Sequence, residues 1–486
     1  MKQFNLLLVL NVLSSLLVIL GISLILPISV SISYNDSGLN GLVVSLVVLI
    51  SIGVLSYLLT KSGNEKEINL RDGFLVVTLG WFFMALAGAL PYYFSGSIPA
   101  FTDCFFESMS GFTTTGATIL SDIEILPKSI LFWRALSHWI GGMGIIVLTI
   151  AILPFLGVGG MQLFKAEVPG STADKLAPRV NQTAKILWLI YVGLTLLEVI
   201  FLYFGDMDLF DAVCHSFATM ATGGFSTKNS SIAYYNSTYI DYVITVFMIL
   251  AGSNFALHYK LLRGRFGDFW KDLEFKVYFS VIIVVTILIT LSNFFNDIYD
   301  TIGESLRYGF FQTASLITTT GFGTADYEKW THFSQLLLFT LFFLGGSAGS
   351  TSGGIKKVRI IVAVKYCLIE LKKILHPNAI IPLRLGEKVV SQNIIHSILG
   401  FILLYILVFF MFTILVSATG VDLLTSLTSS ISCLSNVGPG FGEIGPTENY
   451  SFMNPVTKWI LALAMMIGRL ELNTLFIIIT FSFWKK

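Results

Sequence analysis

Four short glycine loops recur along this chain. Each follows an apolar stretch about half as long as a membrane span and precedes a full-length one. A unit that is repeated four times can place its copies around one axis, so these repeats constrain the fold more than any local pattern does. The loops are Thr113–Ala117, Ala221–Phe225, Thr318–Phe322 and Val437–Phe441. Their last glycines, Gly116, Gly224, Gly321 and Gly440, are 108, 97 and 119 residues apart.

The composition places the repeats in a membrane. Hydrophobic residues make up 55% of the 486 positions and charged residues only 12%, whereas a soluble domain carries roughly 25% charged residues. Apolar stretches repeatedly reach about 20 residues, the length of a bilayer-spanning helix. We therefore predict an all-α polytopic membrane protein in contact with lipid. The net charge of +1 gives no reason to expect a nucleic-acid partner, and the four cysteines show no metal-ligand spacing.

We predict ten full spans and four re-entrant half-helices. The first apolar run, near 5–31, is too long for the core of a signal peptide, so we interpret it as a retained span. Two extra N-terminal spans occupy 1–62, and four span–half-helix–span pore repeats in a pseudo-fourfold arrangement occupy 72–160, 182–266, 272–376 and 388–486. The half-helices lie near 101–112, 209–221, 302–317 and 422–435.

The distribution of positive charge tests this topology. With the N-terminus in the cytoplasm, 23 of the 30 lysines and arginines fall in cytoplasmic segments. An excess of positive charge on the cytoplasmic side is the rule for helical membrane proteins. The pattern predicts a multi-pass protein with both termini in the cytoplasm and all four glycine loops on the outer side.

The glycine loops suit the binding of a cation. Non-helical backbone at membrane depth is tolerated only where it is buried or lines a water-filled cavity. Glycine lets the backbone turn carbonyl oxygens toward an axis, and a ring of carbonyls can replace the hydration shell of a cation. The residues predicted to form such a selectivity filter are Thr114, Thr115, Gly116, Thr222, Gly223, Gly224, Thr319, Thr320, Gly321, Val437, Gly438 and Gly440.

Acidic residues stand near the start of each half-helix: Asp103, Asp211, Asp300 with Glu304, and Asp422. An acid suits the positive end of a helix dipole, and the negative ends would then point toward the axis and favour a cation there. Ordinary N-terminal capping explains the same acids.

One segment of the sequence resembles a known protein family. The segment Arg134–Gly144 (RALSHWIGGMG) is similar to the second span of the first repeat in the Trk/Ktr/HKT superfamily of potassium transporters. The two extra N-terminal spans match its TrkH type. The resemblance implies four repeats around one pore, a homodimer with a pore in each subunit, and potassium and rubidium uptake across the bacterial cytoplasmic (inner) membrane. Family members with Ser at the first filter glycine tend to pass sodium, so Gly116 favours potassium.

The same resemblance implies a regulatory partner, a cytosolic nucleotide-binding ring of the TrkA type. The chain has no Walker A or GxGxxG loop of its own. We therefore expect no cofactor in this chain, potassium ions as the bound metal, and nucleotide (ATP/ADP or NADH) only through the partner subunit.

A second glycine-rich stretch interrupts the last span of the third repeat. Gly345–Gly354 holds five glycines and four hydroxyl residues, a composition that disfavours a helix. The stretch could cross the pore as a gate, which the resemblance implies, or could permit close packing or a kink without a function of its own. The predicted gate residues are Gly345, Gly346, Ser347, Gly349, Gly353 and Gly354, together with Arg469.

Arg469 lies deep inside a predicted span, where a charge is costly and usually faces a cavity or a partner. It could face the pore and repel cations, or it could pair with an acid such as Glu471 or Glu198. His138 is expected to be a packing residue.

Two other functions compete with a potassium pore. A secondary transporter for another cation or an organic solute, sodium-permeable or proton-coupled, would carry paired broken helices, whereas only one span here is clearly interrupted. A membrane enzyme would need a catalytic motif, and no HExxH, GxSxG or paired-carboxylate motif is present. We predict that the chain is not an enzyme.

Overall fold

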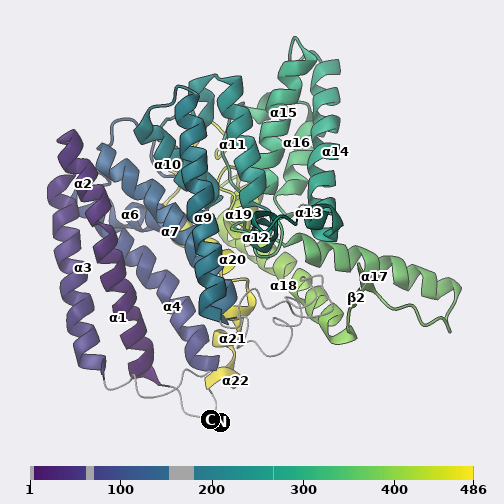
Figure 1. Ribbon diagram of the computed structural model, residues 1–486, viewed down its shortest axis with the longest axis horizontal. Coiled ribbons are helices and arrows are strands. Elements are labelled where there is room, and N and C mark those ends of the chain that lie inside the picture. Colours follow the sequence, from purple (N-terminus) through teal and green to yellow (C-terminus); the bar gives the residue numbers. More distant parts are fainter. Residues whose placement is uncertain (1–4, 62–69, 153–179, 266, 387, 485–486) are drawn as a thin grey trace.

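The computed structural model describes residues 5–61, 70–152, 180–265, 267–386 and 388–484 (Figure 1). Helices make up nearly all of its regular structure, which confirms the predicted all-α class. The sheet structure in the described ranges is one antiparallel pair, β1 (Arg384–Leu385) and β2 (Lys388–Val389).

The two N-terminal spans stand at one side of the molecule (Figure 1, purple). Helices α1 (Leu6–Ser23) and α2 (Ile25–Tyr34) form one span, and α3 (Leu39–Thr60) packs along α1. Small side chains let the helices approach closely: the Ser14 hydroxyl donates to Ser56 over 2.7 Å. Packing through small residues is the usual way for helices to associate in lipid, where apolar surface alone gives no driving force.

The four repeats follow in chain order. The first contains α4 (Leu70–Gly88), α5 (Leu90–Phe94), α6 (Phe101–Phe112) and α7 (Lys128–Ile152). The second contains α9 (Val180–Phe204), α10 (Leu209–Met220), the 3₁₀ turn Ser231–Tyr235, α11 (Thr238–Ala251) and α12 (Phe255–Leu262).

The third repeat contains α13 (Gly267–Lys271), α14 (Leu273–Phe295), α15 (Ile302–Ile317), the 3₁₀ turn Tyr327–Lys329, α16 (His332–Leu341) and α17 (Lys357–Leu375). The fourth contains α18 (Gln392–Ser417), α19 (Leu423–Ser435), α20 (Pro455–Arg469), α21 (Asn473–Ile479) and α22 (Phe481–Trp484). Helix α17 projects sideways from the body of the molecule (Figure 1).

The half-helices α6, α10, α15 and α19 lie where they were predicted, but their caps differ. Asp422 caps α19 by accepting from the Thr425 N–H over 3.0 Å, whereas Thr301, and not Asp300, caps α15. Burial raises the pKa of the Asp422 carboxyl, but hydrogen bonds led by those from Thr425 outweigh burial and hold the pKa below its ordinary value. Asp103 in α6 pairs with Lys458 over 2.7 Å. Ordinary capping therefore explains part of the acid pattern.

More spans are interrupted than predicted. The expectation of one clearly broken span is wrong, because α11 and α12 meet at 101° and α20 is separated from α21. Asn254 accepts from the Ala256 N–H over 2.9 Å and so starts a new helix after the first break. Glu471 and Leu472, with φ of 54° and 39°, end the helical path at the second.

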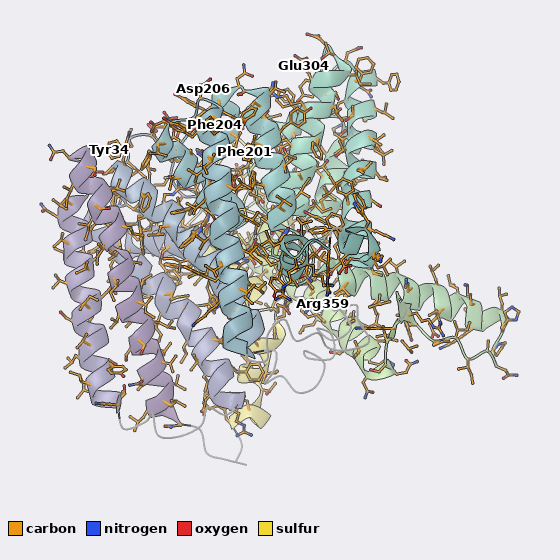
Figure 2. The ribbon with its side chains drawn as sticks, in the orientation of Figure 1. Tyr34, Phe201, Phe204, Asp206, Glu304 and Arg359 are labelled. Atoms are coloured by element: carbon orange, nitrogen blue, oxygen red, sulfur yellow. The ribbon has the colours of Figure 1, made fainter. Side chains whose placement is uncertain are left out.

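Six helices in the described ranges are long and apolar enough to cross a membrane, or seven with the bent pair α11–α12. They are the two N-terminal spans and the first span of every repeat. Three of the second spans are interrupted, whereas α7 is continuous from Lys128 to Ile152. Apolar side chains cover the outside of the molecule: Phe201 and Phe204 on α9 are 43% and 76% exposed, and Figure 2 shows them just below Asp206 at one end of the bundle. This is the surface of a multi-pass membrane protein.

Candidate functional site

All four half-helices end in the same way. One residue with left-handed backbone follows the helix, and the N–H of the next residue donates to the carbonyl five positions earlier, over 2.8 to 2.9 Å. This Schellman geometry satisfies carbonyls that a helix end would leave unpaired. The left-handed residues are Thr114 (φ 51°), Thr222 (54°), Thr319 (58°) and Asn436 (56°).

Three of these left-handed residues are threonines, which is unusual. Asparagine tolerates a positive φ, but a β-branched side chain in this region is a genuine outlier. Such a conformation costs of order 1–3 kcal/mol and persists only where the surrounding structure over-determines it. Strain of this kind, repeated around one centre, is typical of a functional site.

The loops close into a ring, here called the glycine ring, made by Gly116, Gly224, Gly321 and Gly438. All four have positive φ, at 82°, 79°, 83° and 101°. A Cβ atom placed on each would collide with a carbonyl oxygen of the next loop. The distances are 2.1 Å from Gly116 to Gly223 O, 2.0 Å from Gly224 to Thr320 O, 2.0 Å from Gly321 to Val437 O and 2.6 Å from Gly438 to Thr115 O. Only glycine fits at these four positions without a shift of the ring.

The ring corrects the sequence alignment of the fourth loop. Gly438, not Gly440, is equivalent to Gly116, because Gly438 follows the left-handed residue by two positions as the other three glycines do. Gly440 lies outside the ring: its N–H donates to Ile444 O over 2.7 Å, and its carbonyl accepts from the Tyr327 hydroxyl over 2.7 Å. Asn436 was missed, although the preference of asparagine for left-handed backbone could have pointed to it.

The ring is rich in free carbonyl oxygens. The residues concerned, 114–116, 222–224, 319–321 and 436–438, are all buried or half-buried. Of their twelve backbone carbonyls, only that of Gly438 accepts a hydrogen bond from the part of the chain that the structure describes. Buried carbonyls in proteins are nearly always paired, and unpaired ones call for a water or an ion. The arrangement can therefore supply oxygen ligands to a cation.

A polar side chain nine residues before the ring glycine supports the outer part of three loops. Glu107 accepts from Ile119 N over 3.0 Å, and His215 bonds the Ser226 hydroxyl over 2.9 Å. The Gln312 amide oxygen, oriented to satisfy its neighbours, accepts from Thr324 N over 2.8 Å. These side chains fix the loops from behind, so the ring is held by groups that do not face the axis.

Glu107, the first of these supporting side chains, forms an ion pair with Arg134, which also bonds to the second loop. The Arg134 guanidinium pairs with Glu107 over 2.7 Å and donates to Ser226 O over 3.0 Å. It also lies 3.9 Å from the ring centroid of Phe225, against which the His138 ring stacks at 4.0 Å. His138 therefore packs, but neither ring nitrogen has a hydrogen-bond partner among the described residues, so the hydrogen bond expected of a packing histidine is not formed. Both partners of the ion pair are buried, so removal of either one alone would leave an uncompensated charge behind the ring.

Residues 345–354, here called the glycine-rich loop, lie between α16 and α17 and are non-helical and mostly buried. The Gly353 N–H donates to the Thr319 hydroxyl over 2.7 Å, so the loop touches the third ring segment directly. The Thr351 hydroxyl donates to Met220 O, at the end of α10, over 3.1 Å. A Cβ on Gly353 would lie 2.1 Å from Ser435 O, at the end of α19. The loop therefore packs against the carbonyl ends of three half-helices.

The predicted gate residues do not all reach the ring. Ser347 N–H donates to Gly252 O over 2.9 Å, at the break between α11 and α12. Gly349 has φ of 73°, and its carbonyl accepts from Phe255 N. Gly345 packs on Gly353 O. Gly353 makes the ring contact, while the other residues, with Gly346 and Gly354, frame the loop.

Glu274, at the start of α14, bonds to the glycine-rich loop and to the first turn of α17, and was not predicted. One carboxylate oxygen accepts from Ala348 N over 2.8 Å and from Val358 N over 3.2 Å. Hydrogen bonds to a charged acceptor are stronger than neutral ones. The Lys356 ammonium adds a bond to Ser352 O. Glu274 therefore ties the loop to a helix of the same repeat.

Arg469 lies beside the glycine-rich loop. Its guanidinium donates to Thr351 O over 2.8 Å and to Gly141 O, in α7, over 3.3 Å. The alternative pairing with Glu471 is not formed, because Glu471 pairs with Arg359 over 2.6 Å; Figure 2 labels Arg359 at the foot of the central helices. Within the described residues Arg469 is held by carbonyls and has no acid partner, so its charge is left uncompensated.

The fold and the ring define a helical membrane protein with four pore repeats around one axis. The TrkH family model, described as a cation transport protein, matches residues 41–484. Two relatives, each called "Trk system potassium uptake protein TrkH", are 44% identical (Salmonella typhimurium) and 43% identical (Escherichia coli) over 96% of both chains. The crystal structure of the potassium transporter TrkH from Vibrio parahaemolyticus superposes with a TM-score of 0.92 at 34% identity, covering 99% of this chain and 100% of that one.

The chain belongs to the TrkH family. This confirms the resemblance seen in the sequence. Membership of a family of ion transporters also confirms the prediction that the chain is not an enzyme.

Proposed function

We propose that this chain takes up potassium, and also rubidium, through the glycine ring, which acts as a selectivity filter. The observation that carries the proposal is the set of ring carbonyls without hydrogen bonds from the described chain. Carbonyl dipoles of this kind can take the place of a cation's hydration shell. The names of the relatives support potassium as the ion.

The glycine-rich loop is proposed to be the gate. It packs against the carbonyl ends of three half-helices, and its bonds to Thr319, Gly252 and Glu274 join elements that a small shift would separate. Arg469 would add a positive charge on the same side, which repels cations while the loop is closed. Opening would require the loop to leave Thr319 and to expose the path behind the ring.

The cellular setting is part of the same proposal. We propose the bacterial cytoplasmic membrane with both termini in the cytoplasm, a homodimer, and a TrkA-type ring as the nucleotide-binding partner. The phrase "Trk system" in the relatives' names supports a system of several components. The five-part division at 1–62, 72–160, 182–266, 272–376 and 388–486 remains a prediction; residues 153–179 lie outside the described ranges.

The test is rubidium-86 uptake into proteoliposomes that hold the purified chain alone, with potassium, sodium and lithium as competitors. Strong competition by potassium and weak competition by sodium is the expected result. Equal competition by sodium would contradict a potassium filter. No uptake by the folded chain would contradict a pore that conducts without a partner.

One observation favours a second candidate, a coupled secondary transporter. Interrupted helices occur in three second spans, and broken helices are a feature of such transporters. The two candidates differ in their energy source. A pore gives uptake driven by the membrane potential alone, whereas a coupled transporter requires a sodium or proton gradient in the same vesicles.

A further inference from the structure

The fourth segment of the glycine ring differs from the other three in the environment of its carbonyl. The Tyr450 hydroxyl donates to Gly438 O over 2.7 Å. The carbonyls of Gly116, Gly224 and Gly321 accept no hydrogen bond from the described residues. Gly438 is also buried, whereas these three glycines are half-buried. The oxygen that the fourth loop would present to an ion is therefore already engaged by the protein.

The backbone of the fourth loop departs from the others at the same residue. Gly438 has φ of 101°, against 79° to 83° for the other three. The Cβ position of Gly438 lies 2.6 Å from the neighbouring carbonyl, against 2.0 to 2.1 Å elsewhere in the ring. Backbone angle and spacing thus both indicate that the fourth segment is displaced relative to the other three.

Tyr450 lies beside the place where the fourth loop and the first loop are farther apart. The wide contact joins Gly438 to Thr115 of the first loop. Tyr450 bonds both sides of it, since its N–H donates to Thr118 O over 2.8 Å while its hydroxyl holds Gly438. Its ring packs on Phe106 of α6 at 5.5 Å, and the side chain is fully buried.

We propose that Tyr450 is a specificity-determining residue that withdraws the Gly438 carbonyl from the ion. The cation would then meet three carbonyls at the level of the ring glycines. This inference rests on the proposed filter. The number and field strength of the carbonyl ligands around an ion is one proposed source of potassium over sodium selectivity. With three carbonyls at this level, the ring discriminates less than a fourfold ring would.

Tyr450→Phe tests the proposal, because it removes the hydroxyl and keeps the ring in place. A buried carbonyl that loses its donor must find another partner, and the nearest candidate is the cation. A neutral hydrogen bond is worth on the order of 1 kcal/mol, so we expect the preference for potassium over sodium as competitors of rubidium-86 uptake to rise about fivefold.

Tyr327→Phe is the matched control. Tyr327 is equally buried and its hydroxyl also donates to a carbonyl of the fourth loop over 2.7 Å, but that carbonyl belongs to Gly440, outside the ring. It should leave the preference unchanged. Both variants lose one hydroxyl from a buried tyrosine, so a loss of folding would affect them alike, and the elution profile of each purified protein reports it.

The outcomes separate the inference from the proposed function. A rise for Tyr450→Phe alone supports the inference. An unchanged or reduced preference, or the same change in both variants, overturns it. Gly116→Ser in the same assay reports on the filter: if it lowers the preference while Tyr450→Phe does not raise it, only the role of Tyr450 fails. If Gly116→Ser has no effect either, the proposed filter fails.

Discussion

The glycine ring and the glycine-rich loop are built from the same kinds of residue, but they treat their backbone groups in opposite ways. Both are non-helical, buried and rich in glycine and hydroxyl residues. In the ring, nine of the twelve N–H groups donate to carbonyls of the half-helices, while eleven of the twelve carbonyls accept no hydrogen bond from the described chain. In the glycine-rich loop, groups such as Ser347 N–H and Thr351 O are bonded to other parts of the protein.

The difference indicates why one segment can bind an ion while the other can block a path. Free carbonyls offer ligands to a cation. A loop bonded at several points to its neighbours is stabilised in its closed place. Single substitutions can change either the free carbonyls of the ring or the bonds of the glycine-rich loop, and the expected effects differ in size.

The largest effect should come from Gly116→Ser in the ring. The new Cβ would lie 2.1 Å from Gly223 O, at a residue with φ of 82°. Strain of order 1–3 kcal/mol corresponds to a loss of about tenfold or more in preference for potassium over sodium, measured by competition of rubidium-86 uptake. Gly400→Ser in α18, where a Cβ meets nothing within 4 Å, is the control and should behave like the original chain. An unchanged preference for potassium over sodium in Gly116→Ser would contradict the proposal that the glycine ring is the selectivity filter.

Glu274→Gln should weaken the loop more than any other single change outside the ring. The variant replaces a carboxyl oxygen that accepts from two backbone N–H groups by an amide, which weakens two buried hydrogen bonds worth about 0.5–1.5 kcal/mol each. We expect basal rubidium efflux to rise about tenfold.

Glu304→Gln is the control for that change, because Glu304 is exposed at the start of α15 (Figure 2). Equal efflux from the two variants would mean that Glu274 does not restrain the loop.

Arg469→Gln should have a smaller effect of the same sign. The variant removes a positive charge beside the loop and the donors to Thr351 O and Gly141 O. Basal efflux should rise about fivefold. Arg469→Lys keeps the charge but cannot span both carbonyls, so it should fall between the original chain and Arg469→Gln. A fall in efflux for Arg469→Gln would contradict a closing role.

The smallest effect is expected from Arg359→Gln, at the edge of the loop region. The pair with Glu471 is 2.6 Å long, but the Glu471 side chain is 53% exposed. Exposed ion pairs contribute about 0–1 kcal/mol, so efflux should change by about twofold or less. A change as large as that of Glu274→Gln would show that the closed loop depends on this outer pair.

Much of the ring could be predicted from the sequence because it rests on local signals. The half-helices near 101–112 and 302–317 coincide with α6 and α15, since each apolar run is followed directly by a Thr–Gly loop and Thr301 caps the start of α15. The register of the fourth loop could not be predicted, because Gly438 and Gly440 flank one proline and either fits the pattern. Backbone geometry decides between them.

Long-range contacts account for what was missed. Glu274 meets Ala348 across 74 positions, and Tyr327 meets Gly440 across 113. No periodicity or motif marks such pairs. The break after Ala251 was also missed, because Gly252, Ser253 and Asn254 are common within membrane helices, and contacts with Ser347 and Thr351 of the loop help to hold it open.

The most direct test of the account is the position of bound rubidium in an experimental structure of the protein, located by its anomalous scattering. The account predicts a peak on the axis within the glycine ring, coordinated by backbone oxygens of residues 115, 223, 320 and 437. Rubidium bound elsewhere, with the ring empty in protein that takes up rubidium, would contradict it.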